Sequence, residues 1–169
     1  MYKVLFVILL VGLGQLSNAE DSSKNVHKHV HARISIAFDG KQGKIIINAP
    51  AEMIYGFETQ ARSAKDRKLK DQGLLKLDEK IAEAVVLDPA LQCEIRKDMF
   101  EVNQEDKHAD VEADFRVTCQ SAAAGSTIQF NPRKVFSRFK SLNVEVMADS
   151  FQKSVTITKD GETIGLQSD

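Results

Sequence analysis

The chain has 169 residues, and its 23 lysine and arginine residues nearly balance its 24 aspartate and glutamate residues, for a formal net charge of −1 at pH 7. This balance argues against nucleic acid or an anionic membrane surface as a partner, because both call for a strongly basic surface. The length suits one domain with a single sizeable core.

The N-terminus is typical of an export signal. Lys3 precedes an apolar run from Val4 to Leu13, which is too short to span a bilayer, and Ser17-Asn18-Ala19 supplies small residues at a cleavage site. We therefore expect residues 1–19 to be a signal peptide that is cleaved after Ala19, so that the mature chain begins at Glu20. No later segment is apolar enough to cross a membrane, and we expect a secreted protein without membrane insertion.

The mature chain begins with a polar stretch and then a predicted hairpin. Residues 20–28 lack periodicity, and we expect a short disordered lead. From Val30 to Phe38 apolar and polar residues alternate, which predicts a half-buried strand. Asp39 to Gly43 supplies turn residues, Lys44 to Asn48 predicts the second strand, and Pro50 ends it.

Three of the four histidines stand at alternate positions just ahead of this first strand: His27, His29 and His31. If the strand begins here, its period of two places all three imidazoles on one face, with about 7 Å between successive side chains. Neutral imidazole is a common protein ligand of zinc, and two rings on one strand face can turn toward one ion. The spacing therefore indicates a metal site, although histidines near a mature N-terminus are also often solvated without any ligand.

The next segment predicts the longer of two helices. Glu52 to Glu58 is apolar but short, and we interpret it as an irregular packing segment. Ser63 to Ala84 has apolar residues near a period of 3.6, which predicts a helix, and Gly73 near its middle favours a break or bend. Asp88-Pro89 prevents continuation. The lysines and arginines between Arg62 and Lys70 are interpreted as the solvated face of this helix.

Two further strands carry the two cysteines. His108 to Gln120 alternates throughout, and Leu91 to Val102 alternates over its first half. Folding the pair about Asp106 places Cys93 opposite Cys119 on the core face. In an exported chain such a pair most simply forms one disulfide, and the alternative is two buried free thiols.

The same register places several other residues opposite one another: Ile95 and Val117, Met99 and Ala113, Asp98 and Asp114, Arg96 and Arg116. The last two pairs bring like charges together, which is unfavourable. Opposite charges on diagonal neighbours, such as Arg96 and Asp114, would offset this repulsion. The alternative is a β-bulge near Lys97, which would shift the outer half of the hairpin.

The last third of the chain predicts further strands around a short helix. Thr127 to Phe130 is a short strand, and Asn131-Pro132 should begin a two-turn helix with Phe136 and Phe139 directed inward. Leu142 to Ala148 marks another strand. A closing hairpin is predicted with Asp160-Gly161 as a type I′ turn and Ile157 opposite Ile164. In total, seven or eight strands with one longer and one short helix predict a single α+β domain, mainly antiparallel sheet, over residues 29–169.

A second group of possible ligands shares the polar face of one predicted strand: His108, Asp110, Glu112 and Asp114. Such a row is usually a plain solvated strand face, although zinc or a harder ion could bind there. A combined site, in which His108 or a carboxylate joins the three N-terminal histidines, would suit the four-coordinate preference of zinc.

The sequence contains none of the common catalytic motifs. It has no Gly-rich phosphate loop, no Gly-x-Ser-x-Gly, no His-Glu-x-x-His and no Cys-x-x-Cys. We therefore expect no enzymatic activity.

Several motifs follow one another in a specific order: His29-Val30-His31 before a strand that ends in Asp39-Gly40, then Tyr55-Gly56-Phe57-Glu58, then two cysteines around a polar loop. From about Val26 to Leu166 the chain resembles the ZrgA-like proteins, which are zinc-regulated periplasmic proteins of Gram-negative bacteria. The resemblance implies a protein that binds zinc in the periplasm and assists a zinc uptake transporter, with components of a zinc ABC uptake system as possible partners.

The chain departs from the family pattern at three places. Ala32 stands where a glycine is usual, and Thr59 stands where members often have a histidine. The loop from Asn103 to Lys107 has no histidine, whereas many members carry a long histidine-rich insertion there. The resemblance then supports one zinc site at His29 and His31, with His27 and His108 as further ligands, rather than a multi-zinc reservoir.

The sequence thus predicts a periplasmic accessory protein that captures one Zn²⁺ and passes it on. The alternative is a metal-free interaction domain that kept the fold, lost strong zinc binding and offers an exposed strand or sheet face to a partner protein.

Overall fold

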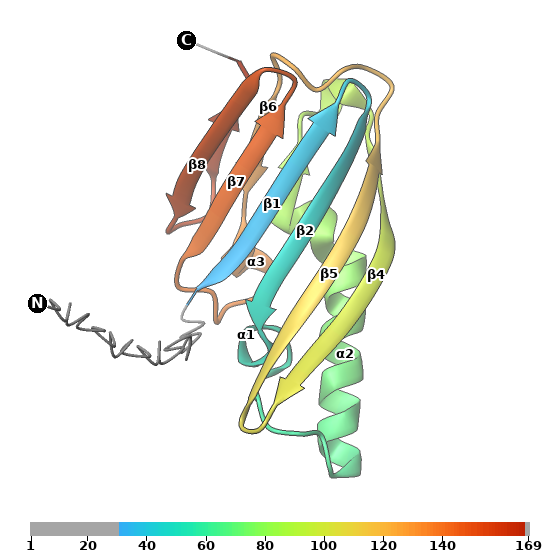
Figure 1. The fold of residues 1–169 in the computed structure, drawn as a ribbon, viewed down its shortest axis with the longest axis vertical. Coiled ribbons are helices and arrows are strands. Elements are labelled where there is room, and N and C mark those ends of the chain that lie inside the picture. The colour runs from blue at the N-terminus through green and yellow to red at the C-terminus, as the bar shows by residue number, and fades with distance from the viewer. Residues whose placement is uncertain (1–30, 168–169) are drawn as a thin grey trace, which may run out of the picture.

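The computed structural model describes residues 31–167, and its largest element is a six-stranded sheet (Figure 1). In spatial order the strands are β4 (Glu94–Glu105), β5 (His108–Thr118), β2 (Gln42–Pro50), β1 (Ala32–Asp39), β7 (Leu142–Ala148) and β8 (Phe151–Ile157). Neighbouring strands pair antiparallel except β1 and β7, which run parallel. Because β1 lies between β2 and β7, the sheet joins the first hairpin to the last third of the chain.

A layer of helices and a small second sheet packs on one face of this sheet. The layer contains α1 (Ala51–Tyr55), α2 (Ala64–Ala84), the 3₁₀ helix η1 (Pro89–Leu91), α3 (Pro132–Val135) and a three-stranded sheet of β3 (Val85–Leu87), β6 (Thr127–Phe130) and β9 (Glu162–Gly165). In Figure 1 the six-stranded sheet faces the viewer and the helices lie behind it. No helix in the described part of the chain is long and apolar enough to cross a membrane.

The strand alternation predicted from the sequence is confirmed. In β1 the apolar side chains from Ala32 to Phe38 are buried against the helical layer, whereas Arg33 on the other face is exposed. In β5 the same holds for Val111 and Phe115 against Arg116. The fold is an α+β architecture as predicted, with nine strands in the described residues instead of seven or eight.

The β4–β5 hairpin confirms the predicted bulge and corrects the register beyond it. Beside the cysteines, Ile95 lies opposite Val117 and Arg96 opposite Arg116, as predicted. The register shifts between Lys97 and Met99, after which Met99 lies opposite Asp114 and Phe100 opposite Ala113. The predicted pairs of Asp98 with Asp114 and of Met99 with Ala113 are therefore wrong.

The physical reason lies in the turn. Glu105 pairs with His108, so the turn contains two residues, Asp106 and Lys107, and is not centred on Asp106 alone. Asp98 is the unpaired residue of the β-bulge in β4. This one extra residue brings the cysteine end of β4 back to the predicted register with β5. Asp98 also relieves the like-charge pair at that end, because Arg116 donates to its carboxylate at 2.8 Å.

The segment before α2, predicted to be irregular, contains the one-turn helix α1. It ends at Gly56, whose φ of 100° places it in the left-handed region that glycine adopts without strain. A single turn of apolar residues is too short to show a helical period, and for this reason the sequence pattern missed it.

The predicted long helix forms, but without a break at Gly73. Ser63 and Asp66 form a capping box at its start, with each side chain accepting a hydrogen bond from the backbone N–H of the other residue. Gly73 is buried, and a Cβ added there would lie 2.5 Å from Cβ of Tyr55. The glycine thus allows α1 to pack closely on α2 and does not interrupt the helix.

The C-terminal hairpin predicted at Asp160-Gly161 is wrong. Ile157 of β8 lies opposite Leu142 of β7, whereas Ile164 of β9 lies opposite Ile128 of β6, in the other sheet. The chain crosses from one sheet to the other at this turn. A local turn signal identifies a reversal but does not identify the strand's partner.

Three smaller differences concern element bounds. The cysteine strand begins at Glu94, because Leu91 lies in η1, and Val85 leaves the helix to start the unpredicted strand β3. The helix α3 has four residues and not two turns, although Phe136 and Phe139 are buried as predicted. The predicted strands at Thr127–Phe130 and Leu142–Ala148 are confirmed.

Candidate metal site

Two of the four candidate histidines lie in the described structure, at the same end of the six-stranded sheet. His31 directly precedes β1, and His108 begins β5 after the hairpin turn. His27 and His29 lie outside the described residues. The described part of the candidate site is therefore built around His31 and His108.

The strand register gives the spacing between these two histidines. Arg33 pairs with Asn48, so continuing the ladder by two residues places His31 beside Pro50, which itself pairs with Asp110 of β5. His31 and Asp110 thus share one row of the sheet, and His108 stands two residues away from Asp110 along β5. Two strand spacings and two residues correspond to roughly 12 Å between the Cα atoms of His31 and His108.

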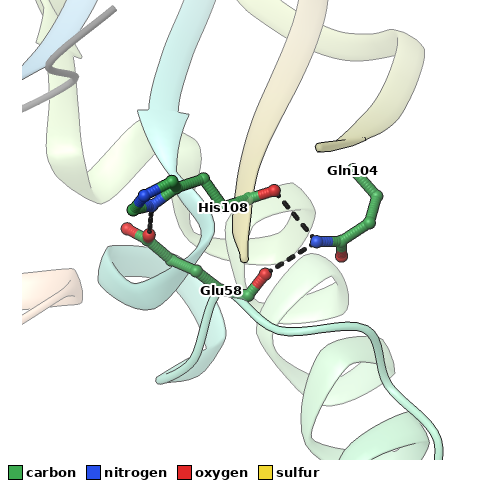
Figure 2. A network of polar contacts seen from close by, with 3 residues as sticks. All are labelled: Glu58, Gln104 and His108. Atoms are coloured by element: carbon green, nitrogen blue, oxygen red, sulfur yellow. Dashed lines mark hydrogen bonds and ion pairs between the residues drawn. The ribbon is translucent and has the colours of Figure 1, made fainter. Parts of the chain in front are cut away.

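His108 belongs to a small polar network that ties the hairpin tip to the segment after α1 (Figure 2). Its Nδ1 lies 2.6 Å from Oε2 of Glu58, and Nε2 of Gln104 donates to the backbone carbonyls of Glu58 and His108, both at 2.9 Å. The ring of His108 is largely exposed. The contact engages Nδ1, so Nε2 is the nitrogen oriented for a ligand.

His31 is held in a comparable way. Its Nδ1 lies 2.8 Å from the hydroxyl oxygen of Ser141, just before β7. An oxygen partner on one imidazole nitrogen fixes the ring and directs the other nitrogen outward, as is usual for histidines that bind metals. In both described histidines an oxygen thus holds Nδ1 and leaves Nε2 available to a ligand.

A cavity of about 590 Å³ lies beside His31, across the ends of four strands. Its walls are formed by His31, Arg33, Asn48, Ala49, Pro50, Asn103, Glu105 and Asp110. The walls thus carry two acids, Glu105 and Asp110, and one base, Arg33.

The carboxylates near this end also act on Tyr55. Burial raises the pKa of the Tyr55 phenol above its ordinary value, and the negative charges of Glu58 and Asp110 raise it further. Glu58 and Asp110 are on different elements, yet both charges act on one buried side chain. The end of the sheet thus combines carboxylates from the α1–α2 connection and from β5.

The row of acids on β5 is divided between different partners. Asp110 lines the cavity, but Asp114 is buried with Oδ2 only 2.6 Å from Nζ of Lys44, and this contact raises the pKa of Lys44. Asp114 is therefore already neutralised by a lysine.

The described residues alone do not assemble a complete metal site. Between His31 and Gln167, no group of three or more histidine, cysteine, aspartate or glutamate side chains is arranged to hold a metal ion. His31 and His108 supply one imidazole each, and zinc prefers four ligands. Further ligands would have to come from outside residues 31–167, where His27 and His29 lie.

Both cysteines are absent from this site because they form a disulfide, Cys93 to Cys119, as predicted. The bridge lies at the other end of the β4–β5 hairpin from His108. It fixes the hairpin without contributing a ligand.

Glu58 is the site residue that the ligand search in the sequence missed. It is separated from His108 by fifty residues, and only the fold brings the two together. Its one sequence signal was its position in the motif Tyr55-Gly56-Phe57-Glu58, which was part of the family resemblance.

Comparison with known proteins adds one finding. A family model described as "ZrgA family zinc uptake protein" matches residues 26–166 of the chain. The comparison with curated proteins gives no match.

Proposed function

The chain belongs to the ZrgA family of zinc uptake proteins, and from this premise we propose that it is an exported accessory protein that captures Zn²⁺ in the periplasm and assists a zinc uptake transporter. Zinc is here the cargo, not a resident cofactor, and the proposed role is transfer of the ion without catalysis. A single site binds the ion, formed by His31 and His108 together with His27 and His29.

The observation that carries this proposal is the shared geometry of the two described histidines. Each has Nδ1 against an oxygen, of Ser141 for His31 and of Glu58 for His108, and both stand at the same end of the six-stranded sheet. A cavity whose walls include His31, Glu105 and Asp110 lies at the same end of the sheet. Ligands from two separate segments suit a site that must also release its ion.

Calorimetric titration with zinc tests the proposal. The chain that begins at Glu20 should bind one Zn²⁺, and the double variant His29→Ala/His31→Ala should lose most of that affinity. The variant Lys28→Ala, which alters the same segment without removing an imidazole, is the matched control and should bind as the wild type does. Equal binding by the wild type and the histidine variant, or no binding by either, would refute the proposal.

The proposal also implies a pH dependence. Protonated imidazole cannot bind a metal, so zinc affinity should weaken below about pH 6. An affinity that stays constant between neutral pH and about pH 5 would indicate that carboxylates, and not histidines, hold the ion.

One observation favours a second candidate function, a metal-free interaction domain. Within residues 31–167 no helix or strand covers the outer face of the six-stranded sheet, and this face exposes Met99 and Met147. Pull-down from a periplasmic extract with and without chelator separates the two functions. A zinc-transfer protein should lose its partner when the metal is removed, whereas an interaction domain should keep it.

A further inference from the structure

The two edge strands of the six-stranded sheet differ in how they are protected against pairing with another chain. A free edge exposes backbone N–H and C=O groups, and proteins usually block it with charges, prolines or bulges. In β4 six of the twelve residues are charged, and Asp98 forms a bulge. In β8 the ladder with β7 is regular, and the strand contains no proline and one charge, Lys153. The edge of β8 is therefore the one suited to receive another strand.

Within residues 31–167 no further strand pairs with the free edge of β8. Its neighbour in the sheet is β7, and β8 ends the strand order. In Figure 1 β8 forms the left margin of the large sheet. Phe151 and Val155 pack against the core from this strand but are only half-buried. A strand added at this edge would cover the exposed parts of both side chains.

We propose that β8 pairs antiparallel with β8 of a second copy of this chain, about a two-fold axis at Ser154. The axis stands perpendicular to the sheet, so the two large sheets join into one and both helical layers lie on the same side. The seven residues of β8 then exchange about six to eight backbone hydrogen bonds. This interaction goes beyond the proposed zinc function, because β8 contains none of the candidate zinc ligands.

The charge pattern of β8 selects this register. Opposing residues must lie on the same face, so the axis passes through a residue position and not between two residues. With the axis at Ser154 all seven residues pair, Phe151 lies opposite the partner's Ile157, and Lys153 lies opposite the partner's Val155. An axis at Lys153 would set the two lysines against each other, which is destabilising. An axis at Val155 would pair five residues instead of seven (7 − 2).

Sedimentation equilibrium of the chain that begins at Glu20 tests the proposal. The measurement is made with chelator, so that its result does not depend on the zinc function. As the protein concentration rises from about 1 μM to about 1 mM, the range of weak association, the average mass should rise from one chain to two. A wild type that stays monomeric over this range would overturn the proposal and leave the edge to an extended segment of another protein.

Charge variants at the axis locate the interface. Ser154 is exposed, and in the dimer its two copies lie opposite each other. Ser154→Lys and Ser154→Glu should each weaken dimerisation by about tenfold or more, because like charges then meet at the axis. An equal mixture of the two variants should dimerise again, because a lysine then opposes a glutamate. Met99→Lys, at an exposed position of the other edge strand, is the matched control and should dimerise as the wild type does.

The mixture also separates a lost interface from a lost fold, since recovery of the dimer requires both variants to be folded. Dimerisation that is unchanged in both Ser154 variants, or that Met99→Lys abolishes instead, would place the interface elsewhere and contradict the proposal. A mixture that remains monomeric would contradict the position of the axis at Ser154.

Discussion

Glu58 and His108 form a carboxylate–imidazole pair, the arrangement by which proteins orient metal-binding histidines. The 2.6 Å contact at Nδ1 leaves Nε2 for the ion and favours the imidazole as a ligand. The sequence predicted His108 as a ligand because of its place on a strand face. It did not predict Glu58, because nothing local links residues fifty positions apart.

The first prediction concerns the single-residue variant Glu58→Gln. Loss of the carboxylate should lower zinc affinity by about 10–100-fold, as is typical when the partner of a metal-binding histidine is removed. Glu52→Gln, on α1 but outside the network, is the control and should bind zinc as the wild type does. Calorimetry measures both, and unchanged affinity in Glu58→Gln would remove His108 from the site.

Tyr55 provides a pH-dependent measurement of the same carboxylates. Burial first, and then the charges of Glu58 and Asp110, raise its pKa, so the folded state favours the neutral phenol. The stability that this provides is fully present below the unfolded pKa of about 10 and is lost as pH rises through the folded pKa.

After cleavage at Ala19, Tyr55 would be the single tyrosine of the chain, so tyrosinate absorbance reports it alone. Glu58→Gln should lower the Tyr55 pKa relative to the wild type, and Glu52→Gln should leave it unchanged. Identical titrations in all three proteins would show that Glu58 does not act on Tyr55.

Among the elements, the β4–β5 hairpin shows both what the sequence predicts and what it does not. Alternation identified the faces of β5, and the like-charge pairs of a regular ladder correctly indicated a bulge, which separates Asp98 from Asp114 but leaves Arg96 opposite Arg116. The position of the two-residue turn was not encoded by alternation, and the outer register was wrong for that reason. The same limit applies to β8 and β9, since hydrophobic pattern specifies a strand's buried face but not which sheet receives it.

Deletion of Asp98 tests the role of the bulge. Without this residue Met99 still lies opposite Asp114 and Lys97 follows directly opposite Phe115, so the ladder becomes regular and the cysteine end keeps its register. We expect the disulfide between Cys93 and Cys119 to persist, so that no free thiol reacts with a labelling reagent in denaturant. Asp98→Ala, which keeps the bulge, should also retain the disulfide, and a deletion variant with two reactive thiols would contradict the assignment.

On the scale of the whole molecule, the disulfide and the candidate site stand at opposite ends of one hairpin. The bridge closes a loop of 26 residues in sequence separation, for which the loop-entropy relation gives about 3.5 kcal/mol of stability. The double variant Cys93→Ala/Cys119→Ala should therefore unfold at a lower urea concentration, with a free energy of unfolding that is smaller by about this amount. A change of less than about 1 kcal/mol would show that the bridge adds little beyond the packing of the hairpin.

The proposed metal site would depend on the whole fold, because its candidate ligands come from the N-terminal segment and from β5. Nitrogen NMR of the four histidine side chains, recorded while zinc is added to the chain that begins at Glu20, observes each imidazole separately. We expect the Nε2 resonances of His31 and His108 to shift together and to saturate at one Zn²⁺ per chain. Resonances that remain unchanged at stoichiometric zinc would contradict the proposal that histidines at this end of the sheet capture the ion.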